Sequence, residues 1–131
     1  MINTALSRDI EAQLLINQLE EHLNLRKIDL IKDLFLQKSF NKFNKRYQNF
    51  REKYKDTKWS IQPIKTNQNE SLLDIKIVST REINDQIYNL STKQTVKIET
   101  YKNKIKGYKV IDEESILNSQ NSPLIIKIIS P

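Results

Sequence analysis

The sequence predicts an α+β fold in which three N-terminal helices pack on a curved antiparallel sheet of four to five strands. Residues 1–56 carry apolar side chains at helical spacing, whereas apolar side chains recur at every second position from Lys58 onward. The two patterns occupy separate halves of the chain, which favours helices laid on one antiparallel sheet over alternating βαβ units. With 131 residues, the chain is expected to form one domain, residues 1–131.

The first predicted helix begins at Thr4 or Ser7 and ends near Asn24. The Ser7 hydroxyl is a typical acceptor for a free backbone N–H at a helix start. The apolar residues of this helix recur three and four positions apart: Ala12, Leu15, Ile16, Leu19 and Leu23. A second, shorter helix is expected over about 26–37.

A third helix is expected from its cap at Ser39 to about Lys55. Its aromatic residues step by three and four and form one stripe: Phe40, Phe43, Tyr47, Phe50 and Tyr54. We interpret this stripe as a buried face, because rings that stack on bases must be exposed. Residues 38–58 also hold eight basic and two acidic side chains, a net charge of +6.

The sheet is expected to begin at Trp59, where the period changes to two. Pro63 lacks a backbone N–H and therefore predicts an edge strand. A polar loop over 66–70 leads to a second strand, and Asn84-Asp85 has the composition of a hairpin turn.

The longest predicted strand runs from Gln86 to Tyr101 and buries one face. Thr92 and Gln94 interrupt its apolar side. They either orient a ligand inside a pocket or turn out to water at a bulge near Ser91, and the sequence leaves both readings open.

The rest of the chain is expected to form two more strands. Residues 102–104 turn the chain, and Gly107, the only glycine, marks a possible bulge that curves the sheet. A loop over 119–123 precedes an apolar strand over 124–129. That strand should be covered on both faces or by a partner chain.

Composition narrows the classes of site. There is no Cys and only one His, so thiolate chemistry and a His-rich metal centre are excluded, and no EF-hand spacing occurs. No cofactor or metal is expected. No apolar run approaches the roughly 18 residues of a membrane span, and the N-terminus lacks a signal-peptide pattern, so a cytoplasmic location is expected.

Two stretches carry a family resemblance. Residues 59–63 open the sheet directly after the third helix, and residues 101–112 combine a polar turn, Lys and Ile with a strand that ends near an acidic residue. Together with the order of elements, they resemble the nuclear transport factor 2-like superfamily. That resemblance implies a cystatin-like α+β cone with a pocket between helices and sheet, and dimerisation through the sheet. The superfamily includes lyases and isomerases as well as non-catalytic binding domains, so the fold alone does not select a function.

Our leading hypothesis is a non-catalytic binding or interaction domain with an apolar pocket. It would bind a small apolar molecule or a partner's peptide and form a homodimer, with the run from Ile125 to Ile129 as one contact. The candidate pocket residues each place a hydrogen-bonding group beside apolar neighbours: His22, Tyr47, Trp59, Tyr88, Gln94, Tyr108 and Asp112.

Two alternatives come from other classes. An acid–base lyase or isomerase of the same fold would use His22 as general base and an inward-facing carboxylate such as Asp112. Asp112 is separated from Tyr108 by an even number of positions, so both would face the same side of a regular strand. The simpler interpretation is that Asp112 is a solvated residue at a strand end and that His22 is a structural histidine near a helix end. Nucleic-acid binding through the basic segment 38–58 is the weaker alternative.

Overall fold

The computed structural model describes residues 4–52, 56–66, 69–119 and 125–129. Three helices precede five strands, as the two apolar periods predict. The helices are α1 (Thr4–Leu25), α2 (Ile28–Asp33) and α3 (Gln37–Glu52), and the strands are β1 (Lys58–Thr66), β2 (Glu70–Ile83), β3 (Gln86–Tyr101), β4 (Lys104–Ser119) and β5 (Ile125–Ile129). The predicted loop over 119–123 lies largely outside the described residues.

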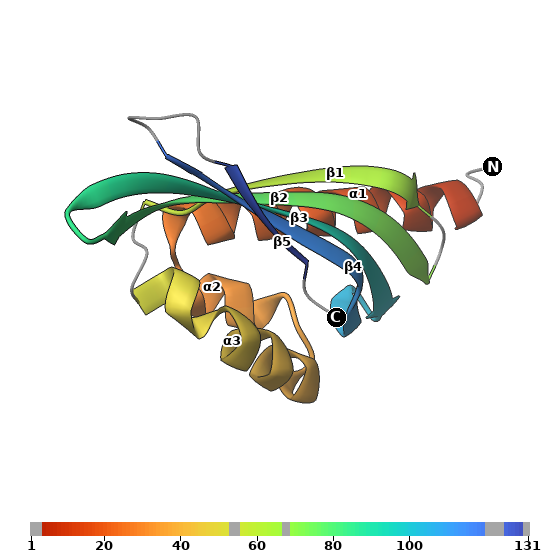
Figure 1. Ribbon diagram of the computed structural model, residues 1–131. Coiled ribbons are helices and arrows are strands. Elements are labelled where there is room, and N and C mark those ends of the chain that lie inside the picture. The colour runs from red at the N-terminus through yellow and green to blue at the C-terminus, as the bar shows by residue number, and fades with distance from the viewer. Residues whose placement is uncertain (1–3, 53–55, 67–68, 120–124, 130–131) are drawn as a thin grey trace.

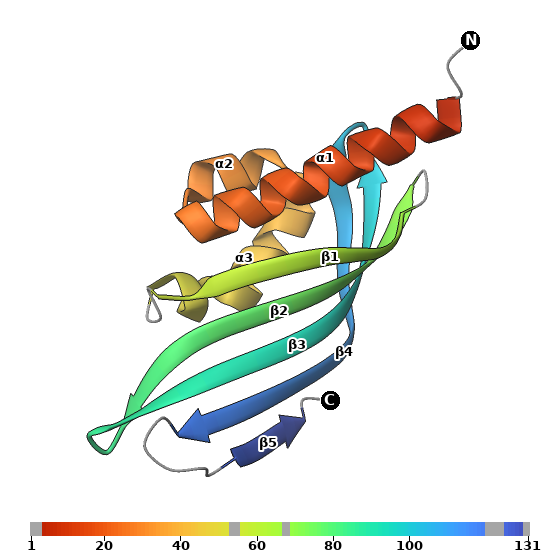
Figure 2. The same cartoon turned by 90° about the horizontal axis from the view of Figure 1, so that it is seen from above.

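The five strands form one curved antiparallel sheet in the order β1-β2-β3-β4-β5. All three helices lie on the same side of this sheet (Figure 1). Figure 2 shows that they cover the part of the sheet near β1, whereas the far ends of β2, β3 and β4, together with β5, extend beyond them. The predicted α+β class is confirmed.

Two tight turns shape the long hairpins. Asn84 and Asp85 join β2 to β3 with φ angles of 51° and 65°, and Lys102 and Asn103 join β3 to β4 with φ angles of 50° and 60°. Positive φ at both central residues is the type I′ geometry, whose twist matches that of antiparallel strands. Asn and Asp tolerate this conformation better than most residues, and they occupy three of these four positions, with Lys102 as the exception.

Irregularities in β4 bend the sheet. The register between β3 and β4 shifts between Glu99 and Thr100, opposite Gly107, and again between Thr95 and Val96. The bulge predicted at Gly107 is therefore present. The second shift inserts Ile111 without a partner, and it changes which face the following residues of β4 occupy.

The core lies between the helices and the concave face of the sheet. The most deeply buried side chains, each at 0% exposure, are Leu19, Leu73, Val96, Ile98 and Ile105. Phe40, Phe43 and Tyr47 are buried at 5–6% exposure, as the aromatic stripe predicts. The side chains of Phe50 and Tyr54 lie outside the described residues. Three buried rings of α3 are thus unavailable for stacking on bases.

Helix α1 protects the edge strand β1. Asn24 donates its side-chain amide to the carbonyl of Trp59 at 3.0 Å and accepts the N–H of Trp59 at 2.7 Å. Glu20 accepts the N–H of Ile61 at 2.6 Å. The predicted edge position of β1 is confirmed, and these side chains satisfy backbone groups that an uncovered edge would offer to another chain.

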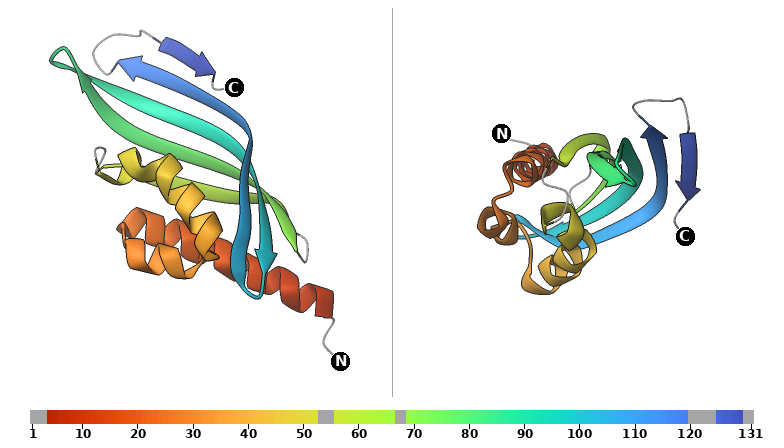
Figure 3. Two further views of the ribbon diagram at one scale, coloured as in Figure 1. Left: turned by 90° about the horizontal axis from the view of Figure 1, so that it is seen from below. Right: turned by 60° about the vertical axis from the view of Figure 1, so that its left-hand side comes forward.

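Helix α1 ends one residue later than expected, at Leu25. Arg26 adopts a left-handed φ of 57°, and Lys27 N–H donates to the carbonyl of His22 while Arg26 N–H donates to that of Leu23, which is a Schellman ending. The chain then enters α2, and the C-terminal end of α1 lies close to β1 (Figure 3).

The connection from α2 to α3 is tied to the start of β4. Ile105 N–H donates to the carbonyl of Leu34 at 2.8 Å, and Leu36 N–H donates to the carbonyl of Ile105 at 3.0 Å. The predicted cap at Ser39 is wrong, because α3 begins at Gln37 and Ser39 lies inside its first turn. The Ser39 hydroxyl instead donates to the carbonyl of Lys106.

Candidate functional site

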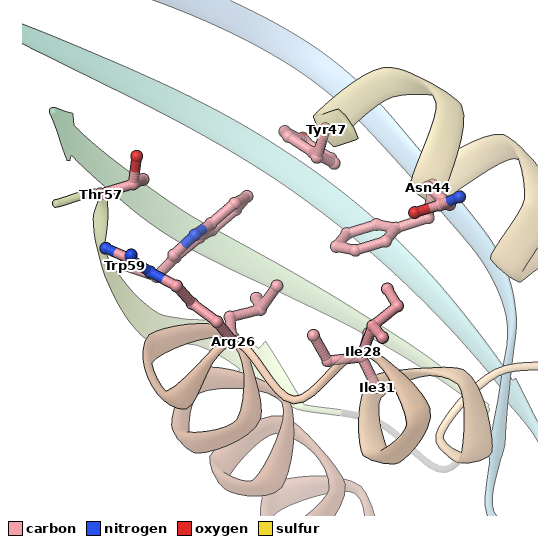
Figure 4. A pocket seen from close by; sticks show the side chains of 9 residues that line it. Arg26, Ile28, Ile31, Asn44, Tyr47, Thr57 and Trp59 are labelled. Carbon is pink, nitrogen blue, oxygen red and sulfur yellow. The ribbon is translucent and has the colours of Figure 1, made fainter. Parts of the chain in front are cut away.

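A pocket lies where the C-terminal end of α1, α2, α3 and the start of β1 meet (Figure 4). Its volume is about 40 Å³. Most of its lining is apolar, and Arg26, Asn44 and Thr57 provide the polar groups. The remaining lining residues are Leu23, Ile28, Ile31, Phe43, Tyr47 and Trp59.

Aromatic rings form the inner wall of the pocket. The Tyr47 ring contacts the Trp59 ring edge-to-face at 5.0 Å between centroids, and the Phe43 ring lies 4.7 Å from that of Tyr47. Tyr108 packs edge-to-face on Phe43 from β4 at 4.9 Å. These contacts fix the rings, because each is buried against at least one neighbour in a preferred geometry.

A polar network lies on the other side of Tyr47. The Tyr47 hydroxyl donates to Gln94 Oε1 at 2.8 Å and lies 3.3 Å from the Tyr108 hydroxyl. Gln94 Nε2 donates to Glu113 Oε1 at 2.7 Å, and Arg46 Nη2 donates to Glu113 Oε2 at 3.3 Å. The network thus runs from the buried hydroxyls to a charged pair at the surface, where the Arg46 side chain is 45% exposed.

Burial dominates the titration of both tyrosines. Desolvation raises the pKa of Tyr47, and hydrogen bonds from its neighbours only partly oppose that shift. Desolvation raises the pKa of Tyr108 well above 10, and the nearby Tyr47 adds to the effect. Both hydroxyls are therefore neutral near pH 7, so they act as hydrogen-bonding groups and not as bases.

The structure brings four of the predicted pocket residues together. Tyr47 and Trp59 line the pocket, and Tyr47 joins Gln94 and Tyr108 in the polar network. Thr92 and Gln94 are each 4% exposed, and the register of β3 is unbroken near Ser91. The polar interruption of β3 therefore faces inward, and the alternative in which a bulge turns it to water is wrong.

The other three predicted residues lie apart from this cluster. Tyr88 donates its hydroxyl to Gln86 near the exposed start of β3. His22 is half-buried, and its Nδ1 is buried without a hydrogen-bond partner in the part of the chain that the structure describes. The pair named in the acid–base alternative, a carboxylate hydrogen-bonded to His22, does not occur among the described residues.

Of the two readings of Asp112, the inward-facing one is wrong and the solvated one is confirmed. Ile111 is the unpaired residue between Val110 and Asp112, so parity changes there and Asp112 pairs with Thr95, on the outer face. Asp112 is exposed, whereas Glu113 pairs with the buried Gln94 and its side chain is 17% exposed. Glu113 is thus the carboxylate of the site. The bulge at Ile111, just before both acids, decides which of them faces inward, and no residue type in 110–113 indicates it.

Arg46 was also missed as a site residue, because a cation beside an aromatic stripe reads as a solvated helix face. Its guanidinium carbon lies 5.9 Å from the centre of the Tyr47 ring, so it covers the ring as well as pairing with Glu113. Within the described residues, no group of three or more His, Asp or Glu side chains is placed to hold a metal ion. No described helix is long and apolar enough to cross a membrane.

Comparisons identify no relative of this chain: no family model, curated protein or solved structure matches it.

Proposed function

We propose that this protein is a non-catalytic interaction domain of the nuclear transport factor 2-like type, and that its pocket accepts one apolar side chain of a partner polypeptide. The pocket volume of about 40 Å³ carries this proposal. Sites for whole small molecules usually measure about 300–1,000 Å³, so the pocket suits the tip of a side chain better than a complete ligand.

The chemistry around the pocket supports a binding role. Leu23, Ile28 and Ile31 provide an apolar lining. Arg26 and Asn44 line the same pocket and can contact a partner's backbone. The tyrosine hydroxyls beside the pocket are neutral and hydrogen-bonded, so they supply neither a base nor a nucleophile.

A titration with N-acetyl-leucinamide, followed by the backbone amide signals in NMR, tests the pocket. We expect millimolar binding, with shifts gathered at Ile28, Asn44 and Thr57. Ile31→Phe should abolish them, because the larger ring occupies the free volume. Leu30→Phe is the matched control, since Leu30 is on the same helix but 39% exposed. Equal shifts in both variants, or shifts scattered over the protein, would contradict the proposal.

The uncovered half of the sheet favours a second property, the formation of a homodimer. Leu90 pairs with Leu117 on neighbouring strands, and both side chains are only partly buried. Figure 2 shows that the far ends of β2, β3 and β4 are free of helices. Apolar side chains on an open sheet face are a common basis of association between identical chains.

Sedimentation equilibrium tests the dimer. We expect a mass near twice 15.5 kDa at micromolar concentration, and a monomer for the Leu90→Asp variant. Thr80→Asp adds the same charge at an exposed position of β2 and should leave the dimer intact. A wild-type chain that remains monomeric at 100-fold higher concentration would rule this property out.

A further inference from the structure

A groove between the start of α3 and the start of β4 carries an unbalanced positive charge. Its volume is about 710 Å³, and it is lined by four lysines, two from each element: Lys38, Lys42, Lys106 and Lys109. The described residues that line it include no carboxylate, although the Glu99 carboxylate lies beside Gly107, its partner across the β3–β4 pair. The ion pairs found among the described residues involve Arg46 and Lys97, and none of these four lysines. Four lysines beside one carboxylate leave an excess of positive charge, so the groove favours an anion.

Backbone groups add to this preference. Helix α3 has 16 residues, and its first intrahelical bond runs from the N–H of Phe40 to the carbonyl of Leu36. The N–H groups of Gln37, Lys38 and Ser39 come before that bond, and the side chain of Leu36 has no acceptor to cap them. These three donors lie on residues that line the groove, beside its lysines.

The groove wall is held in place. The Ser39 hydroxyl donates to the carbonyl of Lys106, which links α3 directly to β4. The backbone bridge between Phe35 and Ile105 joins the connection just before α3 to the start of β4. Lys38 and Lys106 are therefore attached to elements whose spacing is set, so an anion has to order only their exposed side chains and not the backbone.

We propose that this groove binds a small molecule that carries two linked phosphate groups. A single phosphate occupies only part of about 710 Å³ and would leave the lysines of one wall unpaired. A nucleic-acid strand is disfavoured because, in the part of the chain that the structure describes, the groove offers no exposed ring for base stacking. Tyr108, the one aromatic residue among its described lining residues, is half-buried and packs on Phe35, Phe43 and Tyr47.

Titration of the full chain with inorganic pyrophosphate tests the proposal, with calorimetry for affinity and NMR for location. We expect amide shifts at Gln37, Lys38, Ser39 and Gly107, and binding about tenfold tighter than that of inorganic phosphate. Affinity should fall as salt is added, because exposed charges are screened. Shifts that avoid these amides, or equal affinity for the two anions, would overturn the proposal.

A pair of double variants separates the groove from net charge. Lys42→Glu with Lys106→Glu should weaken pyrophosphate binding at least about tenfold. Lys76→Glu with Lys93→Glu removes the same charge at exposed, directly paired positions of β2 and β3, and should change affinity less than about twofold. Equal losses in the two double variants would show a non-specific charge effect and overturn the proposal.

Circular dichroism of each variant identifies unfolding. If the groove variant is unfolded, the single variant Lys42→Gln replaces it, and an unchanged affinity in that variant would equally overturn the proposal. A titration of the wild-type protein with a single-stranded oligonucleotide tests nucleic acid as the alternative ligand. Tighter binding of the oligonucleotide than of pyrophosphate at 150 mM salt would reject the small-molecule ligand in favour of nucleic acid.

Discussion

Replacing Glu113 by alanine tests the register that the bulge in β4 creates. Gln94 is 4% exposed, and its Nε2 donates to Glu113 Oε1 at 2.7 Å. A hydrogen bond to a charged group contributes about 1.5–3 kcal/mol, and the truncation leaves the amide of Gln94 buried without its acceptor. The Arg46 pair adds at most about 0.5 kcal/mol, because the Arg46 side chain is 45% exposed and water screens the pair. We therefore expect Glu113→Ala to lower the free energy of unfolding by about 2–3 kcal/mol.

The loss of stability in Glu113→Ala should be measurable by thermal unfolding and by denaturant unfolding. The entropy of unfolding is about 2.1 cal/mol/K per residue, or roughly 0.28 kcal/mol/K for 131 residues. A loss of 2–3 kcal/mol then lowers Tm by about 7–11 °C. Urea titrations should show a lower midpoint with an unchanged m-value, because the compactness of the two states is the same.

Asp112→Ala is the matched control, since it removes the same charge one residue earlier. Asp112 is exposed on the outer face, so its loss should change stability by less than about 0.5 kcal/mol. Glu113→Gln keeps one acceptor for Gln94, so its loss of unfolding free energy should lie between those of Asp112→Ala and Glu113→Ala. If Asp112→Ala destabilises as much as Glu113→Ala, or if neither has an effect, the assigned register and the role of Glu113 are refuted.

Three further predictions concern other parts of the molecule. Burial raises the pKa of Tyr47 and Tyr108 in the folded state, so the free energy of unfolding is retained below pH 10 and falls as pH rises above it. The fall is up to about 1.4 kcal/mol per pH unit for each ring. Urea titrations from pH 9 to 11 measure this slope, and Tyr108→Phe should reduce it. Asp85→Gly should raise Tm by about 2–4 °C in a thermal melt, because glycine adopts φ 65° without steric cost; a lower Tm would contradict this. Asn24→Ala should cost about 1–2 kcal/mol and promote aggregation, measured by light scattering, because it frees both backbone groups of Trp59; a monodisperse, fully stable variant would disprove this role.

Local patterns in the chain were sufficient to predict the order of helices and strands and about half of the candidate site. The aromatic stripe placed Phe43 and Tyr47 in the core, since a helix face at 3–4 spacing is buried wherever it meets a sheet. The period of two predicted an inward-facing Tyr108 but left the orientation of Gln94 open, and the turn residues positioned both hairpins. These inferences hold because each depends on neighbours within a few residues.

The tertiary structure alone decided which carboxylate serves the site and where charge accumulates. One unpaired residue, Ile111, moves Glu113 inward and Asp112 outward, and pairing between strands is a long-range property that no short pattern encodes. Likewise, Lys42 and Lys106 are distant in sequence and meet only because α3 packs beside β4. The sequence by itself determined the layers of this protein, whereas the contacts between them determined its pocket, its polar network and its basic groove, because those contacts join residues that are far apart along the chain.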